Sequence, residues 1–172
     1  MKFSKRIFII LSICISCIGC DQSTKILAAE YLSKNELHSY FNDVLRIGYT
    51  ENIGAFLGIG NDLPSEYRFW LFVVVVGLFL GGLLVYLLTY SKQSFWSLVG
   101  FSFLFAGGIS NFYDRVVNNG AVVDFLNIGL GSLRTGIFNI ADVTIMIGLA
   151  IVIFVSLKSG DTIKNDYKNC IH

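Results

Sequence analysis

The longest apolar stretch of the chain, from Phe69 to Tyr90, reads FWLFVVVVGLFLGGLLVYLLTY and holds no charged residue. About 20 such residues are enough for a helix to cross the hydrocarbon core of a bilayer. Further apolar segments lie at about residues 7–31, 95–117 and 137–157. Only 15% of the 172 residues are charged, against about 25% in soluble domains. We therefore predict an all-α membrane protein with four transmembrane helices. Residues 1–158 would form one integral-membrane domain, and residues 159–172 a polar cytoplasmic tail.

The first apolar segment also allows a second interpretation. Lys2, Lys5 and Arg6 precede an uncharged run ending in CIGC at positions 17–20, as in a lipoprotein signal peptide with Cys20 as the lipid-modified residue. The apolar pattern then resumes with ILAAEYL, and the other apolar segments follow. We therefore expect an uncleaved first helix, with a lipoprotein anchored through Cys20 as the alternative.

The positions of the basic residues indicate the orientation of the spans. Lys2, Lys5, Arg6, Lys92 and the lysines of the tail all lie at the same end of the four predicted helices. Cytoplasmic loops carry an excess of lysine and arginine. We therefore expect both termini to be cytoplasmic.

The polar residues near the spans fall at one depth. A helix rises about 1.5 Å per residue, so Asp21 lies about 21 Å beyond Ile7 and Asp114 about 29 Å beyond Phe95. The fourth span runs back from the outer surface, so its first polar residues lie there too. Polar groups inside a membrane mark functional sites by default. The residues of this outer layer are Asp21, Lys25, Asn52, Asn111, Asp114, Arg115, Asp124, Asn139 and Asp142.

Spacing brings several of these side chains together. Asp21 and Lys25 are four residues apart on one helix face and can pair. Asn111, Asp114 and Arg115 also share a face. Asn139 is placed to cap the fourth helix. The polar stretch at residues 33–68 contains alternating pieces such as HSYFNDVLRIGYT, which predict short strands at the membrane interface.

The available side chains favour carboxylate chemistry. The chain has two histidines, His38 and His172, and no pattern typical of a zinc site or of a serine–histidine–aspartate triad. Two neighbouring aspartates can share one proton and act as base and acid in peptide hydrolysis. Asp124 with Asp142 is the preferred pair, because Arg115 gives Asp114 a natural structural partner.

Three other interpretations stay open at this point. The aspartates could cap helices and face water. The chain could be a transporter or channel subunit with the acids as an ion relay. Cys14, Cys17 and Cys20 have spacing that fits part of an iron–sulfur ligand run, although small apolar residues on one helix face are the simpler reading.

Five motifs together resemble the lipoprotein signal peptidase family, also called signal peptidase II. They are DQSTK at 21–25, NIGAF at 52–56, GGISNFYDR at 107–115, VVDF at 122–125 and FNIAD at 138–142. They occur in the family's order and cover most of the chain. Ile53 stands where the family often has threonine, and Ser110 where it often has glycine.

The resemblance implies a fold and an activity. It implies a small interfacial β-cradle and a short periplasmic helix between spans 1 and 2. It also implies an aspartic endopeptidase of the bacterial inner membrane that cuts prolipoproteins just before a diacylglyceryl-modified cysteine, with its active site at the outer face. Asp124 and Asp142 would be catalytic, with support from Asn52, Asn111, Arg115, Asn139, Asp21 and Asp114.

The expected partners follow from the same resemblance. The substrate is a prolipoprotein signal peptide with its diacylglyceryl-cysteine, in contact with membrane lipid. We expect no metal and no cofactor, and a monomeric protein. A net charge of +1 without a basic run gives no indication of nucleic-acid binding.

Overall fold

A computed structural model describes residues 1–34, 36–55 and 59–169, with side chains to Lys158. Within these residues, the four helices expected from the sequence are long and apolar enough to cross a membrane. The first is α1 (Phe3–Tyr31), and the third is α4 (Phe95–Val117), which has the predicted bounds. The second runs from Ser65 to Thr89, and the fourth is α5 (Ile140–Asn169).

The second span consists of three consecutive pieces. The short helix α2 (Ser65–Phe69) continues into a π-helix, η2 (Trp70–Val75), and then into α3 (Val76–Thr89). A π-helical turn within a longer helix is uncommon and often marks a functional region. Among the residues described between β2 and Pro64, none is helical, and residues 56–58 lie outside the description. The short helix expected there stays a prediction.

The fourth span differs from the predicted range at both ends. It begins at Ile140 instead of residue 137, because Phe138 pairs with Leu126 in a β-bridge and Asn139 precedes the helix as its cap. Its helical backbone continues past Leu157 to Asn169, so most of the predicted polar tail belongs to the same helix. Within the residues whose side chains are described, the part of this helix suited to a membrane runs from Ile140 to Lys158.

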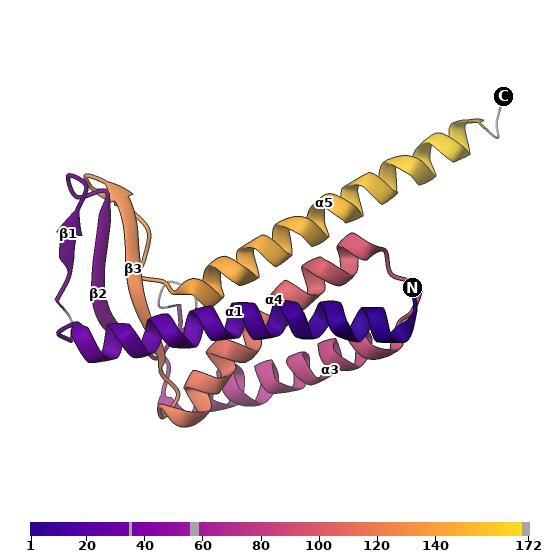
Figure 1. Ribbon diagram of the computed structural model, residues 1–172. Coiled ribbons are helices and arrows are strands. Elements are labelled where there is room, and N and C mark those ends of the chain that lie inside the picture. The colour runs from indigo at the N-terminus through magenta and orange to yellow at the C-terminus, as the bar shows by residue number, and fades with distance from the viewer. Residues whose placement is uncertain (35, 56–58, 170–172) are drawn as a thin grey trace.

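Helix α4 is the centre of the bundle and packs against α1, α3 and α5. The lack of a Cβ at Gly107 permits the contact with α5, since a Cβ there would lie 2.5 Å from the carbonyl oxygen of Ala141. In Figure 1, α5 lies close to the other helices at the end that carries the sheet and diverges from them towards the chain's C-terminus. The N-terminus lies at the end of the bundle opposite the sheet.

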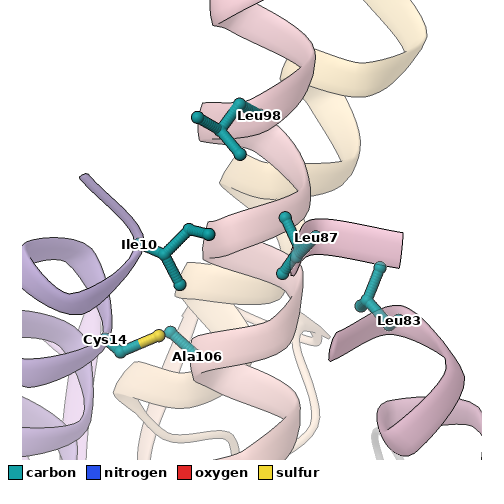
Figure 2. Packing of buried hydrophobic residues seen from close by; sticks show 6 residues of the cluster. All are labelled: Ile10, Cys14, Leu83, Leu87, Leu98 and Ala106. Atoms are coloured by element: carbon teal, nitrogen blue, oxygen red, sulfur yellow. The ribbon is translucent and has the colours of Figure 1, made fainter. Parts of the chain in front are cut away.

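The apolar core joins three of the helices. Figure 2 shows side chains of α1, α3 and α4 packed together at Ile10, Cys14, Leu83, Leu87, Leu98 and Ala106. Arg6 is buried beside this core, where its Nε donates to the carbonyl oxygen of Leu87 at 2.5 Å. Its Nη2 donates to that of Tyr86 at 3.2 Å. Arg6 thereby adds a donor to two carbonyl groups in the last turn of α3, where backbone partners become scarce; the carbonyl of Tyr86 also accepts from the N–H of Tyr90 at 3.0 Å.

A four-stranded antiparallel sheet crosses one end of the bundle (Figure 1). Its strands are β1 (His38–Tyr40), β2 (Leu45–Asn52), β3 (Val122–Leu130) and β4 (Leu133–Arg134), in that order. The four long helices are thus accompanied by a small antiparallel sheet, in agreement with the β-cradle that the resemblance implies. The predicted strands at residues 33–68 supply only half of the sheet, and the other half comes from the connection between α4 and α5.

Strand β3 places Asp124 within the sheet. Val122 and Val123 favour extended backbone, and β3 pairs with β2 so that Asp124 lies opposite Thr50 and Val122 opposite Asn52. The register shifts between Ile47 and Thr50. Pairing of two distant segments therefore places Asn52 and Asp124 side by side at the inner end of the sheet.

Candidate active site

Asp124 is held between two asparagines. Nδ2 of Asn52 donates to Oδ2 of Asp124 at 2.9 Å, and Nδ2 of Asn139 donates to Oδ1 at 2.6 Å. Oδ1 of Asn52 accepts from the backbone N–H of Gly54 at 3.0 Å, which fixes the orientation of its amide. Asp124 itself is only 2% exposed. Each of its carboxylate oxygens therefore has one donor from a different segment of the chain.

The start of α5 holds Asp142. The backbone N–H of Asn139 donates to Oδ2 of Asp142 at 3.1 Å, and the N–H of Asp142 donates to Oδ1 of Asn139 at 3.0 Å. This reciprocal pair is a capping box, which confirms the predicted cap at Asn139. The other oxygen, Oδ1 of Asp142, accepts from Nδ2 of Asn111 at 3.0 Å. Asn139 thus contacts both Asp124 and Asp142.

The environment of Asp124 favours its protonated form. Burial raises the pKa of Asp124 to about 6, and the charge of Asp142 acts in the same direction. The hydrogen bonds from Asn52 and Asn139 stabilise the carboxylate and oppose the rise in pKa. A carboxyl group with such a pKa can hold or release a proton near neutral pH, as acid–base catalysis requires.

A buried ionic cluster lies against this pair of aspartates. Nζ of Lys25 lies 2.7 Å from Oδ2 of Asp21 and 2.8 Å from Oδ2 of Asp114, and it donates to Oδ1 of Asn111 at 2.8 Å. Because Lys25 occupies Oδ1 of Asn111, Nδ2 of Asn111 faces Asp142. The lysine therefore orients the amide that holds one of the two aspartates.

Both carboxylate oxygens of Asp21 and of Asp114 accept hydrogen bonds or ion-pair contacts from the protein. Oδ1 of Asp21 accepts from the backbone N–H of Ala141 at 2.7 Å, and its Oδ2 accepts from Oγ of Ser110 at 2.7 Å. Asp114 accepts from Nε2 of Gln22 at 2.9 Å and from the backbone N–H of Val123 at 3.3 Å. Asp21 ties α1 to α5, and Asp114 ties α4 to the start of β3.

Arg115 connects the loops on either side of the aspartates. Its Nη1 donates to the carbonyl oxygen of Gly120 at 2.8 Å, and its Nη2 donates to that of Gly54. Its guanidinium lies 5.0 Å from the centre of the Phe72 ring in η2, a favourable cation–π distance. Gly54 follows Asn52 and Gly120 precedes β3, so Arg115 fixes the backbone near both ends of the Asn52–Asp124 contact.

The structure thus brings together all nine residues of the outer polar layer predicted from the sequence. Sequence analysis missed Gln22, Ser110 and Phe72. Ser110 lies four residues before Asp114 on α4, and Gln22 lies next to Asp21, so both stand beside predicted residues. No spacing rule would have selected Phe72, because its contact with Arg115 depends on the packing of two spans.

The histidines and cysteines lie apart from this cluster. His38 is exposed in β1, and His172 is outside the described residues. Cys14, Cys17 and Cys20 are free thiols on α1, which runs unbroken through Cys20. Among the described residues, no three histidine, cysteine, aspartate or glutamate side chains are arranged to hold a metal ion.

Comparisons with known proteins identify relatives along most of the chain. The family model for signal peptidase (SPase) II matches residues 13–158. A lipoprotein signal peptidase of Thermodesulfovibrio yellowstonii is 33% identical over 157 residues, which are 91% of this chain and 95% of the relative. One of Staphylococcus haemolyticus is 32% identical over 94% of this chain and 99% of the relative.

The fold is also similar to that of a solved bacterial membrane enzyme. That structure superimposes with a TM-score of 0.74 at 30% sequence identity, and the match covers 92% of this chain and 91% of the other. A second solved bacterial membrane enzyme gives a TM-score of 0.68, also at 30% identity, over 90% of this chain and 94% of the other.

Proposed function

The chain belongs to the lipoprotein signal peptidase (signal peptidase II) family, and from this premise we propose that it is an aspartic endopeptidase in which Asp124 and Asp142 activate water. The contact of Asn139 with both aspartates carries the proposal. One asparagine at the start of α5 holds two buried carboxylates in one place. Two such groups in close proximity share a proton more readily than both ionise.

The proposed reaction begins with one aspartate ionised and the other protonated. The ionised carboxylate takes a proton from water while the water oxygen forms a bond to the scissile carbonyl carbon. The protonated carboxyl gives its proton to the carbonyl oxygen, which produces a tetrahedral diol. Proton transfer to the peptide nitrogen then accompanies cleavage of the carbon–nitrogen bond. The products are a signal peptide with a terminal carboxylate and a lipoprotein with a free amino group on its modified cysteine.

The surrounding residues support each stage of this mechanism. Asn52 and Asn139 hold Asp124, and Asn111, oriented by Lys25, holds Asp142. These bonds restrain the orientation of both carboxylates, which reduces the reorganisation needed during reaction. Arg115 fixes the loops that flank the site. Asp21, Asp114 and Lys25 act as structural support in the proposal.

The proposed substrate fits the position of the site in the membrane. Asp124 belongs to β3 and Asp142 to the first turn of α5, and Figure 1 shows that the sheet lies at the end of the bundle where α5 begins. The peptide bonds of a helix in hydrocarbon are internally hydrogen-bonded and inaccessible to water. We infer that a diacylglyceryl-modified prolipoprotein unwinds at this layer, with its acyl chains remaining in lipid. We place the site at the outer face of the bacterial inner membrane, with both termini in the cytoplasm and the enzyme acting as a monomer.

Cleavage of a defined substrate tests the proposal. Purified protein in lipid nanodiscs is incubated with a diacylglyceryl-modified prolipoprotein, in buffer with a metal chelator, and the products are identified by mass spectrometry. We expect cleavage immediately before the modified cysteine. The unmodified precursor, used as the matched substrate, should remain intact. Two outcomes contradict the proposed activity: cleavage that occurs only when the chelator is left out, and equal cleavage of the modified and unmodified precursors.

A further inference from the structure

A cavity of about 420 Å³ lies between the start of the second span and the end of α4. Its wall includes two arginines, Arg68 and Arg115, and the aromatic rings of Phe69 and Phe72. Among the described residues that line it, none is acidic. The cavity therefore combines cationic hydrogen-bond donors with an apolar surface, which suits the region of a lipid where polar groups join hydrocarbon chains.

The cavity lies near the two aspartates, although neither of them lines it. Ile53, which lines it, follows Asn52, and Asn52 donates directly to Asp124. Arg115 lines it as well and interacts electrostatically with both Asp124 and Asp142. A group bound in this cavity would therefore lie on the Asn52 and Arg115 side of a peptide bond held at the aspartates.

The two arginines differ in how far their donors are used. Arg115 donates to the carbonyl oxygens of Gly54 and Gly120 and packs on Phe72, so its position is fixed by the protein. Arg68 uses Nη1 for carbonyl oxygens of the preceding loop. Within the described part of the chain, no protein group accepts a hydrogen bond from its Nε or Nη2. A guanidinium presents donors on all three nitrogens. Arg115 keeps only Nε without a protein acceptor among the described residues, whereas Arg68 keeps Nε and Nη2, so Arg68 has more donors to offer a ligand.

We propose that this cavity binds the glyceryl diester of the substrate, with Arg68 donating to an ester carbonyl oxygen. The inference rests on the proposed function, because it assigns a position to the lipid that the substrate carries beside its scissile bond. Phe69 and Val116 line the cavity and are 55% and 57% exposed, so the acyl chains can leave past them into the surrounding hydrocarbon. Ile53 adds further apolar surface to the wall.

The contact between Arg68 and the ester carbonyl is tested with the wild type and Arg68→Met, each on two substrates. The natural lipopeptide carries ester-linked chains, and a matched lipopeptide carries ether-linked chains of the same length without the carbonyl oxygens. For the wild type, we expect the ether to have a KM about tenfold higher, with kcat little changed, since a hydrogen bond from a charged donor is lost. Arg68→Met should raise the KM for the ester by a similar factor and leave the KM for the ether nearly unchanged.

The comparison separates binding from structural damage. If Arg68→Met raises the KM for both substrates by the same factor, Arg68 only supports the loop whose carbonyls it contacts, and the inference is wrong. A membrane phospholipid has the same glyceryl diester chemistry. If the KM depends on ester or ether lipids in the nanodisc instead of on the substrate, the cavity holds a membrane lipid and the inference also fails. Failure of the wild type to cleave either lipopeptide would instead contradict the proposed peptidase activity.

Discussion

The Nζ atom of Lys25 lies 2.8 Å from Oδ2 of Asp114, in an ion pair whose side chains are only 3% and 4% exposed. The same Nζ contacts Asp21 at 2.7 Å and Asn111 at 2.8 Å. A lysine ammonium has three N–H donors, and here each has its own acceptor. Lys25 therefore forms ion pairs with buried acids from two helices and, through Asn111, sets the orientation of a group that holds Asp142.

Replacing Lys25 should destabilise the protein strongly. In Lys25→Met, Asp21 and Asp114 remain buried without their cation, which costs about 3–5 kcal/mol in comparable cases. We expect a large fall in melting temperature, measured in detergent or nanodiscs. The matched control is Lys34→Met, because Lys34 pairs with Glu51 at the surface and such pairs contribute about 0–1 kcal/mol. Equal effects of the two substitutions would contradict the role given to Lys25.

The two proposed catalytic aspartates should be individually essential. Asp124→Asn and Asp142→Asn preserve shape and remove the acid–base function, so we expect each to lower kcat by at least about a thousandfold in the lipopeptide assay, in line with a loss of general acid–base catalysis. Glu51→Gln is the control, since Glu51 is an exposed acid of the same sheet. Residual activity near the wild-type value in either variant would remove that residue from the mechanism.

Asp114 should behave differently from Asp124 and Asp142. Its contacts with Lys25, Gln22 and the backbone of Val123 are structural. We therefore expect Asp114→Asn to lower the melting temperature, while the folded fraction retains most of its kcat. Activity normalised to folded protein is the measurement. A stable, fully inserted Asp114→Asn protein without activity would require a different pair of catalytic acids.

Sequence patterns predicted the parts of the fold that depend on local rules. The spans follow from uncharged apolar runs, and the cap at Asn139 follows from its position before an apolar helix. The strand β3 was missed because its partner β2 lies in a distant loop, and pairing across such a distance leaves little local signal. The contacts of Arg115 were also inaccessible, since Gly54 and Gly120 accept through backbone oxygens that any residue possesses.

Arg6 should stabilise the end of the bundle opposite the sheet. Its guanidinium is buried and donates to the carbonyl oxygens of Tyr86 and Leu87 at the end of α3. Arg6→Met keeps much of the apolar volume but leaves these carbonyls without the donor, so we expect a loss of about 1–3 kcal/mol. Lys5→Met, one residue earlier on the exposed surface of α1, is the control and should change the melting temperature little. Cleavage at saturating substrate should be unaffected in both.

The raised pKa of Asp124 predicts how stability depends on pH. An aspartate in an unfolded chain has a pKa of about 3.9, whereas the pKa of Asp124 in the folded protein is about 6. Between these values the folded state binds the proton more tightly than the unfolded state does. The contribution to stability is therefore fully present below about pH 4 and is lost as pH rises through 6, by roughly 3 kcal/mol in total.

Asp124→Asn lacks this titration, so its stability relative to the wild type should increase between pH 4 and pH 6 and stay constant above. Melting temperatures measured across that range test the sign. Glu51 supplies the opposite case, because its hydrogen bond with Lys34 lowers its pKa. Glu51→Gln should therefore lose stability relative to the wild type as the pH rises through 4. If the difference in melting temperature between Asp124→Asn and the wild type does not change with pH, Asp124 does not titrate between pH 4 and pH 6. Asp124 would then be a poor candidate for the aspartate that holds the proton.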